Sequence, residues 1–341
     1  MVYLLPRSLF ASQINQMKHA LKFSRLLRQH LPALIAWLVV GLSNALCQNV
    51  ETVASDSVLQ FIVVGDWGHR GEQFQKPVAI QMSRIAEKEN VDFVISTGDN
   101  FYPDGVVSVR DSMWRRSFED VYAARPLHVK WYPVLGNHDY HVDPQPQVDY
   151  SATSARWHMP ARYYAIRFAL GGDTASQALF VFLDTNPLVP AYFRGTKHKV
   201  RAGDRRAQLD WLREVLKVDS GSVRWRIIVA HHPMYTGGGR RYFNETWPVR
   251  HALKRLLKKA GAHVYLAGHE HSLQHLGPIH GTHHFISGAG ATKTKARKIF
   301  RSRFAVSAYG FMLVSLRRSA FNVQLIDHHG TVLYRMEMNA N

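Results

Sequence analysis

The sequence predicts a layered α/β domain in which mixed β-sheets are covered by helices. In the first half of the chain, runs of β-forming residues alternate with helical patterns, and the second half adds hairpin-like strands. Neither an internal repeat nor a low-complexity linker follows residue 57. These observations predict one domain over residues 58–337.

The expected strands are short apolar runs that end at turn residues. Closing strands are expected at about 311–316 and 321–335. The earlier runs are, in chain order, "VLQFIVVGD", "VDFVISTGD", "WYPVLGN", "RYYAIRF", "LFVFLD", "WRIIVAHHP", "HVYLAGHEH" and "HHFISGAG".

Helical spacing of apolar residues predicts three helices between these strands. The first follows the first strand. The second begins at Asp204, which can act as an N-cap, and runs to about Leu216. The third covers about 247–259, and Gly261 stops it.

The first 47 residues have the pattern of an export signal. Basic residues precede the apolar run "LPALIAWLVVGL" (31–42), and the small residues of "SNALC" (43–47) follow it, so cleavage is expected after Ala45 or Cys47. The run is shorter than the roughly 20 residues that cross a bilayer, which favours a cleaved leader over a permanent anchor. A lipoprotein cut before Cys47 is the alternative. We therefore expect a signal peptide over 1–47 and a secreted or periplasmic protein.

Charge and cysteine content limit the classes of partner and site. The net charge is +18, and +13 remains without the five basic residues of the leader. This charge favours anionic partners, namely phosphate esters, nucleic acid or an acidic surface. No motif indicates a specific nucleic-acid partner, and the basic cluster at 293–303 is expected to be a solvated loop. The single cysteine, Cys47, excludes a disulfide framework and a thiolate zinc site.

Five of the strand-like runs end in polar side chains that could share one site. Ligand sites in α/β sheets form beyond the carboxyl ends of strands, so separate strands can direct their end residues to one point. Each group alone fits a turn, a helix cap or a hydrogen-bonded histidine pair, but their joint occurrence predicts a metal site. The candidate ligands are Asp66, Asp99, Tyr102, Asn137, His231, His269 and His271.

Seven ligands exceed the needs of one tetrahedral ion and therefore favour two metals. A carboxylate such as Asp99 can bridge ions that lie about 3.5–4 Å apart. The phenol of Tyr102 has an ordinary pKa of about 10, so its deprotonation near neutral pH needs a strongly acidic cation, for which Fe(III) is the natural candidate. The asparagine and histidine side of the site suits a divalent ion, Fe, Zn or Mn.

The motifs "GDWG", "GDNFY", "GNHDY", "HHP" and "GHEH" follow one another as in the metallophosphoesterase superfamily, which the chain resembles over about residues 60–290. Tyr102 narrows the resemblance to purple acid phosphatases, particularly the small tartrate-resistant type. The resemblance implies a four-layer sandwich of two mixed β-sheets flanked by helices. It places His231, two residues before Pro233, among the ligands in preference to His232. Fe(III) would be held by Asp66, Asp99, Tyr102 and His271, and the divalent ion by Asp99, Asn137, His231 and His269.

The resemblance also implies residues that contact the substrate. Asn137 would bind it, and His138 would hold the phosphoryl group or donate a proton to the leaving alkoxide. Family members usually carry another histidine after "HxP", whereas this chain reads "MYTGGGRRYF" and has none before His251. Arg240 or Arg241 could bind phosphate there, because a guanidinium binds it bidentately, but an arginine cannot donate a proton at working pH. A solvated loop tip is the alternative for both arginines.

The expected function is that of a secreted, monomeric acid phosphatase without a permanent membrane anchor. It would hydrolyse phosphomonoesters with a hydroxide activated by the two metals. A phosphodiesterase or nuclease on the same metal site is an alternative that the basic charge favours. A catalytically idle phosphate- or metal-binding protein is another, suggested by the altered "GGGR" loop, although all seven expected ligands and His138 are present. The metallophosphoesterase catalytic domain is expected to span residues 58–337.

Overall fold

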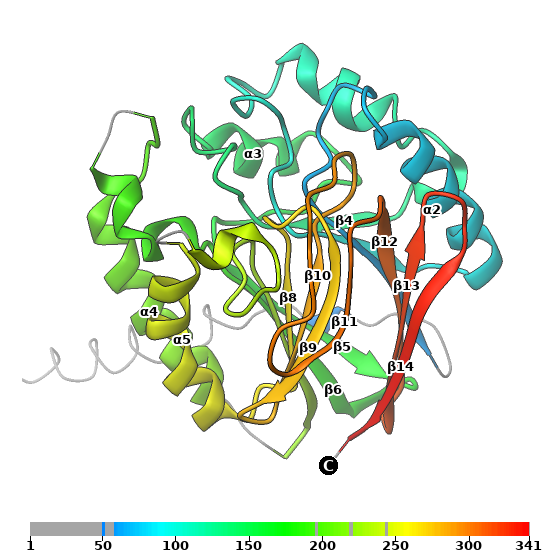
Figure 1. The fold of residues 1–341 in the computed structure, drawn as a ribbon, viewed down its shortest axis with the longest axis vertical. Helices are drawn as coiled ribbons and strands as arrows, with labels where there is room; N and C mark the ends of the chain where they lie inside the picture. The colour runs from blue at the N-terminus through cyan, green and yellow to red at the C-terminus, as the bar shows by residue number, and fades with distance from the viewer. Residues whose placement is uncertain (1–49, 52–57, 195–196, 218–220, 243–244, 341) are drawn as a thin grey trace, which may run out of the picture. The chain divides into compact units, whose positions relative to one another are not determined.

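Two mixed β-sheets form the centre of the protein (Figure 1). The structure, a computed structural model, describes residues 50–51, 58–194, 197–217, 221–242 and 245–340. The expected signal peptide over 1–47 lies outside the described residues. Within the described ranges, one sheet has eight strands and the other has six. Each sheet combines parallel and antiparallel neighbours.

The smaller sheet has the order β14-β13-β12-β2-β3-β4. The first three of its strands along the chain, β2, β3 and β4, run parallel to one another, and an antiparallel meander from β12 to β14 continues the sheet beside β2. The parallel strands therefore end at one edge. The strands are β2 (Leu59–Val64), β3 (Phe93–Ser96), β4 (Lys130–Pro133), β12 (Gly310–Leu316), β13 (Ala320–Asp327) and β14 (Val332–Asn339).

The larger sheet has the order β1-β5-β6-β7-β8-β10-β9-β11. At its centre, β6, β7, β8 and β10 are parallel neighbours, and antiparallel partners lie on either side. The strands are β1 (Val50–Glu51), β5 (Tyr164–Leu170), β6 (Asp173–Phe182), β7 (Val223–Val229), β8 (Val264–Ala267), β9 (Leu273–Ile279), β10 (Thr282–Ser287) and β11 (Ser302–Val306).

Helices cover the outer faces of both sheets. In Figure 1, α4 and α5 lie on one side of the sheets and α2 on the other. The α-helices are α2 (Gln75–Glu89), α3 (Gln145–Asp149), α4 (Ala202–Lys217) and α5 (Thr246–Ala260). Short helical turns are η1 (Trp114–Glu119), η2 (Arg125–Leu127), η3 (Tyr150–Ala152), η4 (Asn186–Leu188), η5 (Pro190–Phe193) and η6 (Gly239–Tyr242).

Alternation of side chains along the strands builds two apolar cores. Phe180 of β6 faces the other sheet, where its ring meets Phe61 of β2 edge-on at 5.4 Å between centroids. The neighbouring Val181 faces the opposite way, into the core that Leu212 of α4 and Leu253 of α5 share. The predicted α/β arrangement of two mixed sheets flanked by helices is therefore confirmed.

The structure differs from the sequence prediction at the end of the chain. The run predicted as one strand over 321–335 forms two strands, β13 and β14, joined by a tight turn. Asp327 makes the turn because its Oδ1 accepts the backbone N–H groups of His329 and Thr331, and Gly330 adopts a left-handed φ of 88°. Among the described residues, no helix is long and apolar enough to cross a membrane.

Candidate metal centre

The candidate ligands lie in turns that follow the parallel strands of both sheets. Asp66 follows β2, and Asp99 follows β3. Asn137 comes shortly after β4, and the histidines follow β7 and β8. Since these turns leave the same ends of parallel strands, the two sheets bring five distant segments to one place.

A first group of ligands surrounds the hydroxyl of Tyr102. This hydroxyl lies 2.8 Å from Asp99 Oδ2, 3.3 Å from Asp66 Oδ1 and 3.3 Å from His271 Nε2. His271 Nε2 is itself 3.4 Å from Asp66 Oδ1. Four side chains expected to bind the same ion therefore meet with their donor atoms toward one another.

A second group lies on the other side of Asp99. His231 Nε2 is 3.2 Å from Asn137 Oδ1, 3.1 Å from His269 Nδ1 and 3.6 Å from Asp99 Oδ1. Asp99 thus directs one carboxylate oxygen to Tyr102 and the other to the histidine pair. This geometry suits a carboxylate that bridges two ions.

Hydrogen bonds behind the histidines fix which ring nitrogens are free to bind metal. His231 Nδ1–H donates to the Thr97 carbonyl at 2.8 Å, and His269 Nε2–H donates to Glu245 Oε2 at 2.8 Å. In the neutral rings, the lone pairs of His231 Nε2 and His269 Nδ1 therefore face each other. Two lone pairs at 3.1 Å beside a buried carboxylate repel one another unless a cation lies between them. The donor set therefore fits a metal ion.

The electrostatics of the first group also fit a cation of high charge. Burial raises the pKa of Tyr102 well above its ordinary value, and the carboxylates of Asp99 and Asp66 raise it further. Burial also opposes ionisation of Asp99, but the surrounding histidines outweigh it and hold its pKa below the usual range. A phenolate at Tyr102 consequently needs a strong positive charge at this position.

The backbone is strained where the ligands are presented. Asp66, Asp99 and His269 have positive φ values of 58°, 50° and 67°, in the left-handed region that non-glycine residues rarely adopt. Such a conformation costs about 1–3 kcal/mol per residue and is typical of functional sites. Gly136 is required for another reason, since a Cβ there would lie 2.1 Å from Asp99 Oδ1.

The predicted substrate residues lie at different distances from this centre. His138 Nδ1–H donates to the Pro103 carbonyl at 2.6 Å, and the His138 ring lies 4.3 Å from that of Tyr102. The backbone N–H of Arg240 donates to Glu270 Oε1, and its guanidinium lies 3.7 Å from Glu245 Oε2. The side chain of Arg241 lies outside the described residues. His138 is thus beside the metal ligands, whereas Arg240 reaches them through Glu245.

Several residues that support the site were not identified from the sequence. Glu245 accepts from His269 and from the Tyr192 hydroxyl at 2.9 Å, and Thr292 Oγ1 lies 2.6 Å from His271 Nδ1. The His232 ring lies 4.5 Å from that of His269, between centroids, but both of its ring nitrogens are hydrogen-bonded, to Thr185 Oγ1 and to the Tyr192 hydroxyl. His69 stacks on Tyr102 with ring centroids 4.2 Å apart. Its position after "GDWG" is the signal that could have drawn attention to His69, and His232 stands in the "HHP" motif, whereas Glu245 and Thr292 carry no local signal.

Comparison with known proteins places this geometry in a family. Residues 59–273 match the calcineurin-like phosphoesterase family. Purple acid phosphatase 17 of Arabidopsis thaliana is 33% identical over 313 residues, which cover 87% of this chain and 89% of that protein. Tartrate-resistant acid phosphatase type 5 of Homo sapiens is 28% identical over 89% of this chain and 97% of its own.

Solved structures share the fold. GAP50, the anchor in the inner membrane complex of Plasmodium, matches with a TM-score of 0.74 at 24% identity over 84% of this chain and 90% of that chain. A purple acid phosphatase from yellow lupin seeds matches with a TM-score of 0.63 at 17% identity over 84% of this chain and 54% of that chain. The chain therefore belongs to the calcineurin-like phosphoesterase family and, within it, to the purple acid phosphatases, which are metal-dependent hydrolases of phosphoric monoesters.

Proposed function

We propose that the protein is a secreted phosphomonoesterase whose binuclear centre combines Fe(III) with a divalent ion. The observation that carries this proposal is the position of the Tyr102 hydroxyl, which lies 2.8 Å from the Asp99 carboxylate, whose other oxygen faces the histidine pair. A phenol is a hard oxygen donor, and the buried carboxylates beside it add further negative charge. This combination favours a trivalent ion in the first group.

The two groups of ligands assign a set of residues to each ion. When bound, the ions would supply positive charge to the phosphoryl oxygens and lower the pKa of water to near neutrality. The divalent ion would be Fe, Zn or Mn, held by Asp99, Asn137, His231 and His269. Fe(III) would be held by Asp66, Asp99, Tyr102 and His271.

His138 would act on the substrate through one defined nitrogen. The Pro103 carbonyl can only accept, so it fixes the proton of His138 on Nδ1. Nε2 remains to carry the exchangeable proton, and in the charged ring it can hold a phosphoryl oxygen or donate to the leaving alkoxide. Arg240, and Arg241 beside it in the sequence, would attract the phosphate dianion as fixed positive charges.

Secretion and a monomeric state are further proposals, and the sequence supports the first of them. The basic and apolar pattern over 1–47 supports export. A phosphodiesterase on the same centre is the second candidate function, because the net charge of +13 that remains without the leader also attracts larger anions.

Metal analysis with a visible spectrum tests the centre. Protein purified in air should contain iron and a divalent ion and should absorb visible light through its Fe(III) phenolate. Tyr102→Phe should lose this absorption, whereas Tyr122→Phe, at a buried tyrosine outside the ligand groups, should keep it. Iron-free, colourless wild-type protein would refute the iron assignment. Comparing kcat/KM for nitrophenyl phosphate and for bis-nitrophenyl phosphate separates monoesterase from diesterase.

A further inference from the structure

The loop between β10 and β11 carries a basic surface that the proposed reaction does not use. We call residues 293–303, which are the end of this loop and the first two residues of β11, the basic loop. It exposes six basic side chains, and the sequence has no acidic residue between Glu270 and Asp327. In the part of the chain that the structure describes, Lys295, Lys298 and Arg301 form no ion pair. Their positive charge is therefore available to an anionic partner.

An apolar ring stands among these charges. Phe300 is 84% exposed, more than any other large hydrophobic side chain of the described residues. Lys298 and Arg301 flank it in the sequence, and the Arg301 guanidinium lies 5.1 Å from the centroid of the Phe300 ring. A single exposed apolar residue is ordinary on a protein surface. An aromatic ring surrounded by uncompensated cations is the combination that membrane-surface segments use.

The backbone of the basic loop is tied to the rest of the protein. The N–H of Thr294 donates to the carbonyl of His271 at 2.7 Å, and the N–H of Arg297 donates to the carbonyl of Gly237 at 3.2 Å. Ile299 packs against the core beneath α4 and α5, directly before the exposed Phe300. The loop is therefore held with its cations and its aromatic ring toward solvent. Such preorganisation reduces the entropy lost when a partner binds.

We propose that the basic loop docks the protein on an anionic lipid surface. Phe300 would enter the boundary between headgroups and acyl chains, while the cations would contact lipid phosphates. A single-stranded nucleic acid fits less well, because its bases stack on several aromatic rings along a basic groove, whereas the basic loop offers one exposed ring. Docking does not depend on the proposed phosphatase reaction.

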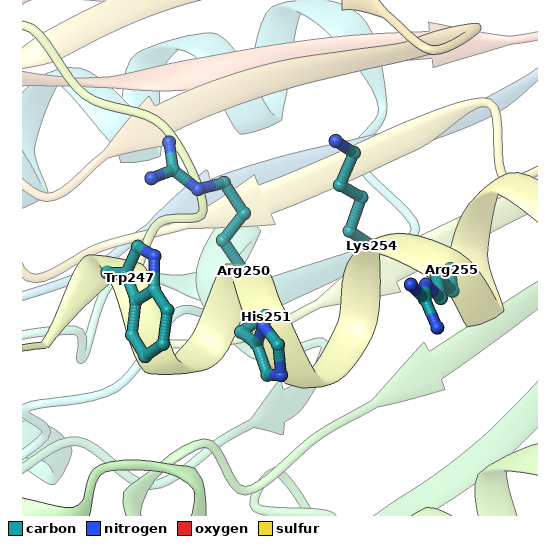
Figure 2. A pocket seen from close by; sticks show the side chains of 5 residues that line it. All are labelled: Trp247, Arg250, His251, Lys254 and Arg255. Atoms are coloured by element: carbon teal, nitrogen blue, oxygen red, sulfur yellow. The ribbon is translucent and has the colours of Figure 1, made fainter.

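A second basic surface provides a matched control. Trp247, Arg250, His251, Lys254 and Arg255 line a hollow on α5 (Figure 2). Trp247 is 60% exposed, compared with 84% for Phe300, and its ring stacks on His251 at 5.1 Å between centroids. Lys254→Ser with Arg255→Ser removes the same charge as Lys298→Ser with Arg301→Ser, from a different element.

Sedimentation with vesicles tests the proposal on the full chain. Vesicles of phosphatidylcholine alone are compared with vesicles that also contain phosphatidylglycerol, at low and raised salt. Each basic residue near an anionic surface is worth about a fivefold change in partition, so the loop double variant should bind anionic vesicles about 25-fold more weakly. Phe300→Ser should weaken binding about tenfold. The apolar run 31–42 is common to all variants, so ratios between variants isolate the basic loop.

Each outcome decides the proposal. It is supported if anionic vesicles bind more tightly than neutral ones, if both loop variants lose this binding and if the α5 variant keeps it. It is overturned if Phe300→Ser binds like wild type, because the ring then does not enter the membrane. It is also overturned if the α5 variant loses as much binding as the loop double variant, because basic residues elsewhere on the surface then contribute as much as the basic loop. Binding of single-stranded DNA that depends on Phe300, without vesicle binding, would also overturn it. Melting temperature and activity on a soluble monoester verify that the loop variants fold.

Discussion

Replacing Glu245 with glutamine tests how His269 is held in its metal-binding form. His269 is 1% exposed, and its Nε2–H donates to Glu245 Oε2 at 2.8 Å, which leaves the Nδ1 lone pair toward His231. A glutamine amide can present an N–H group to Nε2 instead. In that orientation the ring proton moves to Nδ1, the nitrogen that would bind the divalent ion; in the other orientation the amide oxygen accepts from Nε2–H as a neutral group in place of a charged one. The change therefore acts on the metal site without touching a ligand.

The size of the effect follows from the hydrogen bond that is lost. A hydrogen bond to a charged group contributes about 1.5–3 kcal/mol. Because about 1.4 kcal/mol corresponds to a factor of ten in a binding constant, Glu245→Gln should bind the divalent ion about 10–100-fold more weakly. Loss of the group behind a histidine ligand typically has this effect on metal affinity. Fe(III) should remain, since Glu245 contacts none of its expected ligands in the described hydrogen bonds.

Competition between the metal-depleted protein and a coloured chelator for Zn²⁺ measures this affinity directly. Glu270→Gln is the matched control. Glu270 is also buried, but its carboxylate accepts a hydrogen bond from the backbone N–H of Arg240. Burial raises the pKa of Glu270 and so favours the neutral acid, which a glutamine side chain resembles. Unchanged zinc affinity in Glu245→Gln, or an equal loss in Glu270→Gln, would refute the role of Glu245 in orienting His269.

Three further outcomes are expected. His138→Ala should keep both metals but lose about 10²–10⁴-fold in kcat, because general acid catalysis contributes that much; an unchanged kcat would exclude a catalytic role. Gly136→Ala should abolish divalent-ion binding, since its Cβ would lie 2.1 Å from Asp99 Oδ1, whereas Gly203→Ala, with open space around the Cβ, should bind normally. Burial raises the pKa of Asp184 to about 6, so between about pH 4 and 6 the folded protein keeps a proton on Asp184 that the unfolded chain releases. The free energy of unfolding should therefore fall as pH rises through this range. In urea unfolding, the free energy of unfolding of Asp184→Asn should fall by about 3 kcal/mol less than that of the wild type over this pH range. If the free energies of unfolding of the variant and the wild type change in parallel with pH, the raised pKa of Asp184 is contradicted.

The fold and the meeting of the candidate ligands in one place could be anticipated because both depend on local signals. Apolar runs that end in polar turns mark parallel strands, and the edge where such strands end is where ligands meet. Asp99 and Tyr102 stand in one such turn, and the structure brings their oxygens to 2.8 Å. The turn before β14 was missed because Asp327 and Gly330 interrupt a long run of β-forming residues only briefly.

Contacts behind the ligands depend on long-range packing that no local pattern encodes. Glu245 is 24 residues from His269 in the sequence and follows a glycine-rich stretch without apolar periodicity. Any hydrogen-bond acceptor close enough can accept the N–H of a histidine ligand. The acceptor therefore need not be of one residue type or stand at a fixed distance from the histidine in the sequence. Metal ligands are easier to recognise because few side chains can bind an ion.

Arg240 lies in the loop where the resembled family usually carries a histidine, and its role can be understood through its contact with Glu245. Burial alone would raise the pKa of Glu245, but the hydrogen bond from His269 and the charges of His269 and Arg240 lower it to about 2. Glu245 therefore stays ionised in acidic solution and continues to accept the His269 proton on Nε2. An arginine cannot act as the acid that a histidine could supply. It can instead stabilise, from 3.7 Å, the carboxylate that accepts the His269 proton on Nε2 and leaves Nδ1 free for the proposed divalent ion.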